Sequence, residues 1–140
     1  MSQHTLSPYQ QKEIDMASPQ VLIIDDHNLG NICALVFKHG GISAEIVVDG
    51  RMALDRLKEV QPKMILLDLH MPGISGQVVL DKIRSDTRLS DTIVVLTTAD
   101  LVLMQQLQEK ADLVLPKPFK VEQLRELASR LALSSNVEIG

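Results

Sequence analysis

Three carboxylates follow directly on short apolar runs of the sequence. Val21–Ile24 leads into Asp25 and Asp26, and Met64–Leu67 leads into Asp68. A continuous apolar run of this kind is typical of a strand that is covered on both faces of a parallel sheet. Parallel strands of one sheet end at the same edge, where open α/β sheets build their sites, so the sequence predicts that the three carboxylates share one crevice.

Two more polar side chains stand near the ends of later apolar runs. Ile93–Leu96 is followed by Thr97 and Thr98, and Leu113–Leu115 is followed by a proline and then Lys117. Each group has an ordinary interpretation when it is taken alone, because acids and threonines cap helices or form turns, and lysines are usually solvated. Four strand ends that all carry such groups favour a common site instead.

Three clustered carboxylates repel one another, and without compensation at least one of them would take up a proton. A divalent cation together with the ammonium group of Lys117 would balance the three negative charges. Carboxylate oxygens suit Mg²⁺, which is therefore the expected cofactor, with Asp25, Asp26 and Asp68 as candidate ligands. Zinc is not expected, because the histidines share no metal-ligand spacing, and His27 is interpreted as a surface residue in a turn or helix cap.

The same arrangement fits phosphoryl transfer to a carboxylate, which needs an in-line nucleophile, a cation for the phosphate oxygens and further donors. Asp68 is the expected nucleophile. Asp26 would hold the cation, and Asp25 would contact it directly or through water. Lys117 would pair with the phosphoryl group as a point charge, and the Thr98 hydroxyl would donate to another of its oxygens.

Helical periodicity separates the apolar runs. Apolar residues recur at helical spacing in five segments, several of them next to a glycine or a proline. The expected helices lie around residues 32–36, 52–60, 78–83, 101–110 and 121–131, and a further strand is expected over 44–48, with Asp49 and Gly50 as its turn. Five strands that alternate with five helices predict a single α/β domain with a doubly wound, five-stranded parallel sheet.

The composition is that of one ordinary globular domain. The chain has 140 residues, of which 45% are hydrophobic and 23% charged, and its formal net charge is −4. It has no basic run to follow a nucleic acid backbone, so direct nucleic acid binding is not expected. No apolar run approaches the roughly 20 residues that span a bilayer, so membrane insertion is not expected either. The single cysteine, Cys33, is expected in the core, and the absence of a secretion signal pattern favours a cytoplasmic location.

The two ends of the chain are expected to lie outside the domain. Residues 1–20 are polar and are interpreted as an N-terminal tail, with a short helix over Tyr9–Met16 as the alternative. Residues 21–133 form the expected domain. Residues 134–140 are expected to form a short polar C-terminal tail.

At four places the sequence resembles the signature blocks of bacterial response regulator receiver domains, namely I-I-D-D, L-L-D-L-H-M-P-G-I-S-G, V-L-T-T-A and L-P-K-P-F. The resemblance covers about residues 21–133. It implies a flavodoxin-like fold and phosphorylation of Asp68 by a histidine kinase or a histidine phosphotransfer protein. It also implies that Mg²⁺ is bound by Asp26, Asp68 and the backbone carbonyl of His70.

The resemblance extends to further positions. It implies a cis bond between Lys117 and Pro118, and it implies that Thr98 is the switch hydroxyl, because Thr98 directly precedes the small Ala99. His70 and Asp100 lie two residues beyond Asp68 and Thr98, where side chains of this family affect how fast water reaches the acyl phosphate.

One departure from the family pattern concerns signal transmission. Val114 stands three residues before Lys117, where the family often has an aromatic residue. The usual coupling between the switch hydroxyl and that aromatic ring is thus not expected here.

Three functions compete. The leading hypothesis is a phosphoacceptor switch that promotes its own phosphorylation and dephosphorylation but is not an enzyme acting on an outside substrate. The second is a phosphohydrolase with an aspartyl intermediate. Such enzymes generally need an acid/base carboxylate two residues after the nucleophile, and His70 stands at that position. The third is an interaction domain that works without phosphorylation. The presence of the complete set of acids, threonine and lysine argues against it.

The downstream partner is not readable from the sequence. Residues 101–104 are more apolar than one buried helical stripe requires, so part of that helix is a candidate surface for a partner, while core packing is the favoured interpretation of most of these side chains. A homodimer through the last helices is a further candidate. The chain is expected to be either a stand-alone receiver or a piece of a longer regulator.

Overall fold

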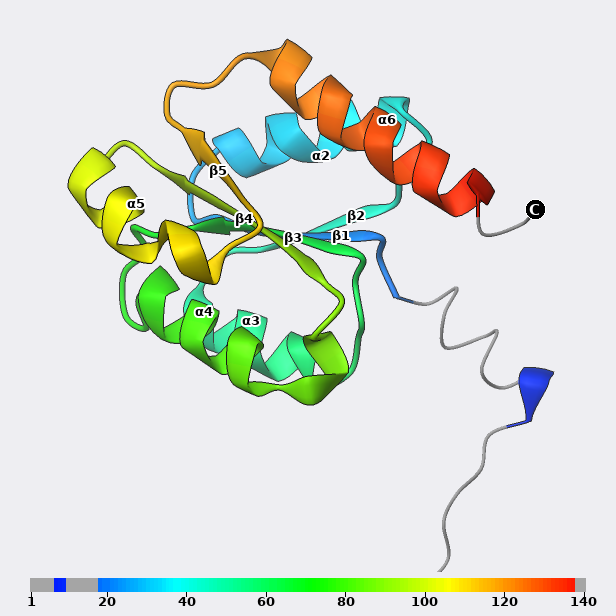
Figure 1. Cartoon of the computed structure of the whole chain (residues 1–140), viewed down its shortest axis with the longest axis horizontal. Helices are drawn as coiled ribbons and strands as arrows, with labels where there is room; N and C mark the ends of the chain where they lie inside the picture. The colour runs from blue at the N-terminus through cyan, green and yellow to red at the C-terminus, as the bar shows by residue number, and fades with distance from the viewer. Residues whose placement is uncertain (1–6, 10–17, 138–140) are drawn as a thin grey trace, which may run out of the picture.

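The computed structural model describes residues 7–9 and 18–137. Within them, five strands form one sheet in the order β2-β1-β3-β4-β5, and every neighbouring pair is parallel. The strands are β1 (Val21–Ile24), β2 (Ala44–Val47), β3 (Met64–Asp68), β4 (Ile93–Thr98) and β5 (Leu113–Pro116). The predicted flavodoxin-like α/β fold is confirmed (Figure 1).

Helices cover both faces of the sheet. The helices are α2 (Leu29–His39), α3 (Gly50–Leu57), α4 (Gly76–Ser85), α5 (Leu101–Leu107) and α6 (Val121–Val137), and two short 3-10 turns, η1 (Thr87–Leu89) and η2 (Gln108–Lys110), follow α4 and α5. Figure 1 shows α2 and α6 together on one face of the sheet and α3, α4 and α5 on the other. The sheet is therefore doubly wound, as predicted.

Each central strand contributes to two cores, which explains why its sequence does not alternate. Val21 and Ile23 pack into the core beneath α2 and α6, whereas Leu22 and Ile24 pack into the core beneath α3 and α4. A strand covered on both faces needs apolar residues at every position. Cys33 lies in the first core, as predicted, and burial raises the pKa of its thiol to about 12.

The strand order places the ends of β1 and β3 beside each other. β1 pairs with β2 on one side and with β3 on the other, so the direction of winding reverses between β1 and β3. Ile24 is in register with Leu67, and the next residues along the chain are Asp25 and Asp68. Open α/β sheets bind their ligands in the crevice at such a switch point. The fold thus brings two of the predicted carboxylates to one edge.

Some element bounds differ from the predicted ones. Asp49 and Gly50 do not form a turn after the strand but begin α3, because the Asp49 side chain accepts a hydrogen bond from the Met52 amide over 2.7 Å and caps the helix. β4 extends through Thr98, two residues beyond its apolar run. The closing helix α6 continues to Val137.

No helix in the described part of the chain has the length and apolar content needed to cross a membrane. The N-terminal tail predicted for residues 1–20 falls largely outside the described residues. The alternative helix over Tyr9–Met16 also lies outside them, apart from Tyr9 itself.

Gly76, the first residue of α4, lies where this helix meets the end of β3. A Cβ atom on Gly76 would lie 2.6 Å from the Cα atom of Leu69 and closer still to the carbonyl oxygen of Asp68. Both are backbone atoms, which cannot rotate away. Gly30 in α2 is also helical, but a Cβ atom there would meet its nearest neighbours at an ordinary 3.5 Å. Close backbone approach therefore requires glycine at Gly76, as it also does at Gly50, where a Cβ atom would lie 2.5 Å from the carbonyl oxygen of Ile74.

We expect Gly76→Ala to lower the free energy of unfolding by about 2 kcal/mol or more, because the added methyl group overpacks a rigid contact. Gly30→Ala is the matched control, and it should change stability by less than about 1 kcal/mol, since alanine is the better helix former. Urea denaturation followed by circular dichroism measures both. Equal effects of the two substitutions would contradict the steric argument.

Candidate functional site

Backbone amides of the neighbouring loops hold the two buried carboxylates of the site. The Asp68 side chain, at the end of β3, is 1% exposed, and its Oδ1 accepts a hydrogen bond from the His70 amide over 2.9 Å. The Asp25 side chain, directly after β1, accepts a hydrogen bond from the His27 amide over 2.7 Å. Each loop thus turns back on its own carboxylate, and both carboxylates are fixed before any ligand arrives.

Lys117 supplies a positive charge from the loop after β5. Its backbone amide donates to the carbonyl of Thr98 over 2.9 Å, which ties the loop to the end of β4. Its Nζ atom donates to Asp68 Oδ2 over 3.2 Å and lies 4.0 Å from Asp25 Oδ2. The peptide bond between Lys117 and Pro118 is cis, the geometry that the family resemblance implies.

Burial is the main electrostatic cost of the site. Burial raises the pKa of Asp25 above its ordinary value of 3.8, and the charge of Asp68 adds to this effect. The hydrogen bond from the His27 amide and the charge of Lys117 lower the pKa of the same carboxyl, but they do not outweigh its burial. The predicted repulsion between acids therefore acts in the expected direction, with the loss of hydration as the larger cause.

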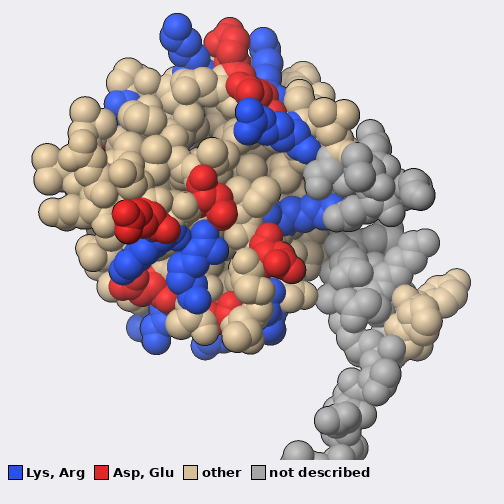
Figure 2. All heavy atoms as spheres, viewed as in Figure 1, with Lys and Arg blue, Asp and Glu red and all other residues tan. Residues whose placement is uncertain are grey.

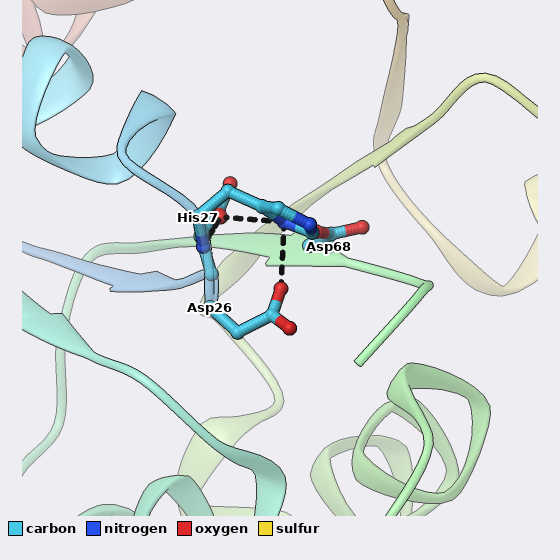
Figure 3. A group of neighbouring side chains, drawn as sticks. Asp26, His27 and Asp68 are labelled. Atoms are coloured by element: carbon cyan, nitrogen blue, oxygen red, sulfur yellow. Dashed lines mark hydrogen bonds and ion pairs between the residues drawn. The ribbon is translucent and has the colours of Figure 1, made fainter. Parts of the chain in front are cut away.

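Asp26 and His27 complete the cluster. The His27 Nδ1 atom lies 2.7 Å from Asp26 Oδ1, 3.4 Å from Asp68 Oδ2 and 3.5 Å from Asp25 Oδ1. Figure 3 shows the His27 ring joined by dashed lines to the carboxylates of Asp26 and Asp68. The sequence predicts only a turn or capping role for His27, although its position directly after two acids at a strand end is a signal for the site.

The donor set fits a divalent cation. One atom from each of Asp25, Asp26, His27 and Asp68 lies within 4.8 Å of all the others. Asp26 Oδ1 is buried and accepts no hydrogen bond, although the imidazole nitrogen is near it. Buried oxygens in proteins are rarely left without a partner. An oxygen-rich cluster in which one carboxylate oxygen accepts no hydrogen bond is compatible with a hard cation.

The predicted switch residues lie at the rim of the cluster. Thr98 is fully buried, and its hydroxyl accepts a hydrogen bond from the Asp100 amide over 3.0 Å. The Thr97 hydroxyl donates instead to the Leu67 carbonyl over 3.4 Å. Asp100 in turn caps α5 by accepting a hydrogen bond from the Leu103 amide over 3.0 Å.

The two predicted modulating side chains face each other across the mouth. The His70 Nε2 atom lies 3.9 Å from Asp100 Oδ2, and both side chains are about half exposed. Ala99, beside them, is exposed and small. The structure thus brings Asp25, Asp26, Asp68 and Lys117 into one cluster, and His70, whose amide donates to Asp68, lies 3.9 Å from Asp100.

A family model described as the response regulator receiver domain matches residues 21–129. The chain belongs to this family and is the receiver domain of a two-component response regulator. Receiver domains are not enzymes in the usual sense.

Individual relatives agree with this family. The DNA-binding response regulator MtrA of Mycobacterium tuberculosis is 34% identical over 116 residues, which cover 79% of this chain and 49% of MtrA. The DNA-binding dual master transcriptional regulator RpaA of Synechocystis is 32% identical over 114 residues, which cover 76% of this chain and 46% of RpaA. The chain therefore spans about half the length of these curated relatives.

Solved structures share the fold. The chemotaxis response regulator CheY4 of Vibrio cholerae superposes on this chain with a TM-score of 0.73 at 24% identity. The superposition covers 82% of this chain and 99% of the CheY4 chain. At this identity the likeness establishes the fold alone.

The raised pKa of Asp25 leads to a stability prediction. Because the folded-state pKa lies above 3.8, the charged carboxylate destabilises the folded protein at neutral pH. We expect Asp25→Asn to raise the free energy of unfolding of the metal-free protein by about 1–2 kcal/mol, since a neutral amide keeps an acceptor oxygen and costs less to bury. Urea denaturation in the presence of a chelator measures the change.

The sign of the pH dependence is fixed by the same argument. Protonation neutralises Asp25 as the pH falls through its folded-state pKa, so the advantage of Asp25→Asn should shrink on acidification. Asp91→Asn, at an exposed position, is the control and should have no effect at any pH. An Asp25→Asn variant that is less stable than the native protein at neutral pH would refute the prediction.

Proposed function

We propose that the chain accepts a phosphoryl group on Asp68 from a phosphohistidine of a histidine kinase or of a histidine phosphotransfer protein. The observation that carries the proposal is the Asp68 carboxylate, which is 1% exposed and has its Oδ2 3.2 Å from Lys117 Nζ. In the transfer, an Asp68 oxygen attacks phosphorus, the P–N bond breaks and an acyl phosphate P–O bond forms. The leaving imidazole keeps the electron pair of that bond.

The acids around Asp68 are assigned to the cation in this proposal. Asp25, Asp26, Asp68 and the backbone carbonyl of His70 would hold Mg²⁺. Such an ion, when bound, neutralises charge on the phosphoryl oxygens. The Oδ1 atom of Asp26, which is buried and accepts no hydrogen bond, supports this assignment. Lys117 adds a further positive charge, and its ammonium group already lies between Asp68 and Asp25.

Thr98 is assigned the role of the switch residue, whose hydroxyl responds to phosphorylation of Asp68. Its hydroxyl accepts a hydrogen bond from the Asp100 amide, so the hydroxyl proton is left for an oxygen of a phosphoryl group on Asp68. A shift of Thr98 toward that group would shift an existing equilibrium of the loop before α5. The small Ala99 beside it leaves the mouth open for the phosphodonor.

The surface of α5 is the proposed output. Leu101 and Val102 are 59% and 66% exposed, and Leu113 in β5 is 38% exposed. Figure 2 shows a largely uncharged surface over α5, while Lys, Arg, Asp and Glu gather over α4 and α6. Val114, which stands where the family often has an aromatic residue, packs against the core on the α5 face of the sheet. A protein partner, or a second copy through the last helices, is proposed to bind there.

Nucleic acid binding is not assigned to the 140 residues themselves, which carry a net charge of −4. MtrA and RpaA are DNA-binding proteins, and this chain aligns with about half of each. An output on DNA would therefore be exerted by a partner or by a segment outside the aligned part. The proposed receiver domain spans residues 21–133, and the proposed location is the cytoplasm, where kinases draw on ATP.

The chemistry is self-catalysed in this proposal. The chain promotes transfer onto its own Asp68 and later hydrolysis, in which water attacks phosphorus and the acyl phosphate bond breaks to release phosphate. It acts on no outside substrate. The position two residues after Asp68 carries His70 rather than the carboxylate of an aspartyl phosphohydrolase.

The assignment of the phosphoacceptor is tested by labelling. Acetyl phosphate and Mg²⁺ should add one phosphoryl group to the full chain, and Asp68→Asn should abolish the addition, because an amide is not a nucleophile of this kind. Intact-mass spectrometry at neutral pH measures the product. Asp91→Asn, at an exposed acid, should be labelled like the native chain. Labelling that survives Asp68→Asn would reject the assignment.

The lifetime of the phosphorylated chain tests the two residues at the mouth. We expect His70→Ala combined with Asp100→Asn to speed hydrolysis several-fold, because the pair across the mouth is lost while the α5 cap keeps an acceptor oxygen. Loss of mass label over time measures the rate. Arg130→Ala, which breaks an exposed ion pair on α6, is the control and should leave the rate unchanged. An unchanged rate in the double variant would rule out the modulating role.

A further inference from the structure

We propose that Arg84 clamps the C-terminal end of the α5 segment to α4, so that this end stays fixed while the first turn of α5 moves with the switch. The α5 segment is α5 together with η2, residues 101–110. The inference deepens the proposed function and rests on it for the motion of Thr98. The clamped end lies beside α4 and leads into the start of β5, whereas Lys117 follows the other end of that strand (Figure 1).

Apolar packing holds the α5 segment at only a few positions. Met104 and Leu107 are the buried residues of α5, and none of the three residues of η2 is buried. Leu101 and Val102, in the first turn, are exposed. Segments with few buried apolar contacts are those that open locally at low cost in free energy. Polar contacts therefore have a large share in fixing the two ends of this segment.

Arg84, in the last turn of α4, holds the C-terminal end by two hydrogen bonds. Its Nε atom donates to the carbonyl of Lys110, the last residue of η2, over 2.6 Å. Its Nη2 atom donates to Asp112 Oδ2 over 2.9 Å. The planar guanidinium group presents its donors in a fixed fork, so it holds both acceptors in one position relative to α4.

Asp112 extends the same contact into the sheet. Its Oδ2 atom also accepts a hydrogen bond from the Val94 amide over 2.8 Å, and its own amide donates to the Val94 carbonyl over 2.9 Å. The carboxylate thus joins β4 to the guanidinium group of Arg84. A further ion pair of 3.0 Å between Lys110 and Asp81 also reaches α4, but both side chains are about half exposed, so this pair adds little.

The first turn of α5 is attached to a different part of the molecule. The Asp100 amide donates to the Thr98 hydroxyl, and the Asp100 carboxylate accepts from the Leu103 amide. This end of the segment is therefore joined to the switch hydroxyl, while the other end is joined to α4 and β4. Displacement of Thr98 tilts α5 about its clamped end instead of sliding the whole segment along the sheet.

Amide hydrogen exchange of the full chain, followed by NMR, tests the clamp. Arg84→Gln should speed exchange of the Ala111 and Asp112 amides about tenfold, because a charge-assisted hydrogen bond is lost, and should change the amides of α6 less than about twofold. Asp112→Asn should have a smaller effect, since its side-chain oxygen still accepts from the Val94 amide and Arg84 still donates to the Lys110 carbonyl.

Arg56→Gln is the matched control. Arg56 is 31% exposed, close to the 28% of Arg84, and it donates to both carboxylate oxygens of Glu45. It ties α3 to β2, on the far side of the sheet order from β5. Its loss should leave exchange of the Ala111 and Asp112 amides unchanged.

Beryllofluoride with Mg²⁺, which mimics a phosphoryl group on Asp68, tests the fixed end. In the native chain, its addition should shift the amide resonances of Asp100 and Leu103 and leave those of Ala111 and Asp112 in place. In Arg84→Gln the shifts should extend to Ala111 and Asp112, because the end of the segment is no longer held.

Unchanged exchange at Ala111 and Asp112 in Arg84→Gln would overturn the inference. Beryllofluoride shifts at these two amides in the native chain as large as those at Asp100 would overturn it as well. If beryllofluoride shifts no amide, including those around Asp68, the proposed function fails, and the exchange measurement still decides whether Arg84 holds the end of the segment.

Discussion

The ammonium group of Lys117 faces two carboxylates that have lost almost all their water, and the site depends on this contact. It lies 3.2 Å from Asp68 and 4.0 Å from Asp25, whose side chains are 1% and 7% exposed. A buried carboxylate costs several kcal/mol unless charges and hydrogen bonds compensate it. The amides of His27 and His70 provide part of that compensation. The remaining negative charge is the charge that a bound cation would neutralise.

The strand ends could be predicted from the sequence because the apolar runs stop abruptly. β1 is buried at every position, and so is β3 up to and including Asp68; two carboxylates, Asp25 and Asp26, directly follow β1, and one, Asp68, ends β3. Because paired parallel strands end at the same edge of a sheet, the proximity of these ends can be predicted without knowing any side-chain contact. Asp49 shows the limit of this reasoning, since an aspartate before a glycine suits both a turn and a helix cap. The cap it makes to Met52 decides between them.

His27 was missed for a different physical reason. Its side chain is 59% exposed, so the prediction of a surface residue was correct, yet its Nδ1 atom reaches three carboxylates. A sequence does not state which way a half-exposed ring turns. Asn28, the residue at the N-cap position of α2, makes no side-chain hydrogen bond to this helix. Likewise, repulsion between acids was predictable, but the larger cost of burying Asp25 required its exposure to be known.

Asp100 connects Thr98, at the end of β4, to the first turn of α5. Its amide donates to the Thr98 hydroxyl, and its carboxylate accepts from the Leu103 amide, so two hydrogen bonds through one residue join the end of β4 to the first turn of α5. Any displacement of that hydroxyl pulls on the cap of the helix. In the proposed switch, motion of Thr98 would reach α5 through these two hydrogen bonds and the main chain, a route that does not include Val114.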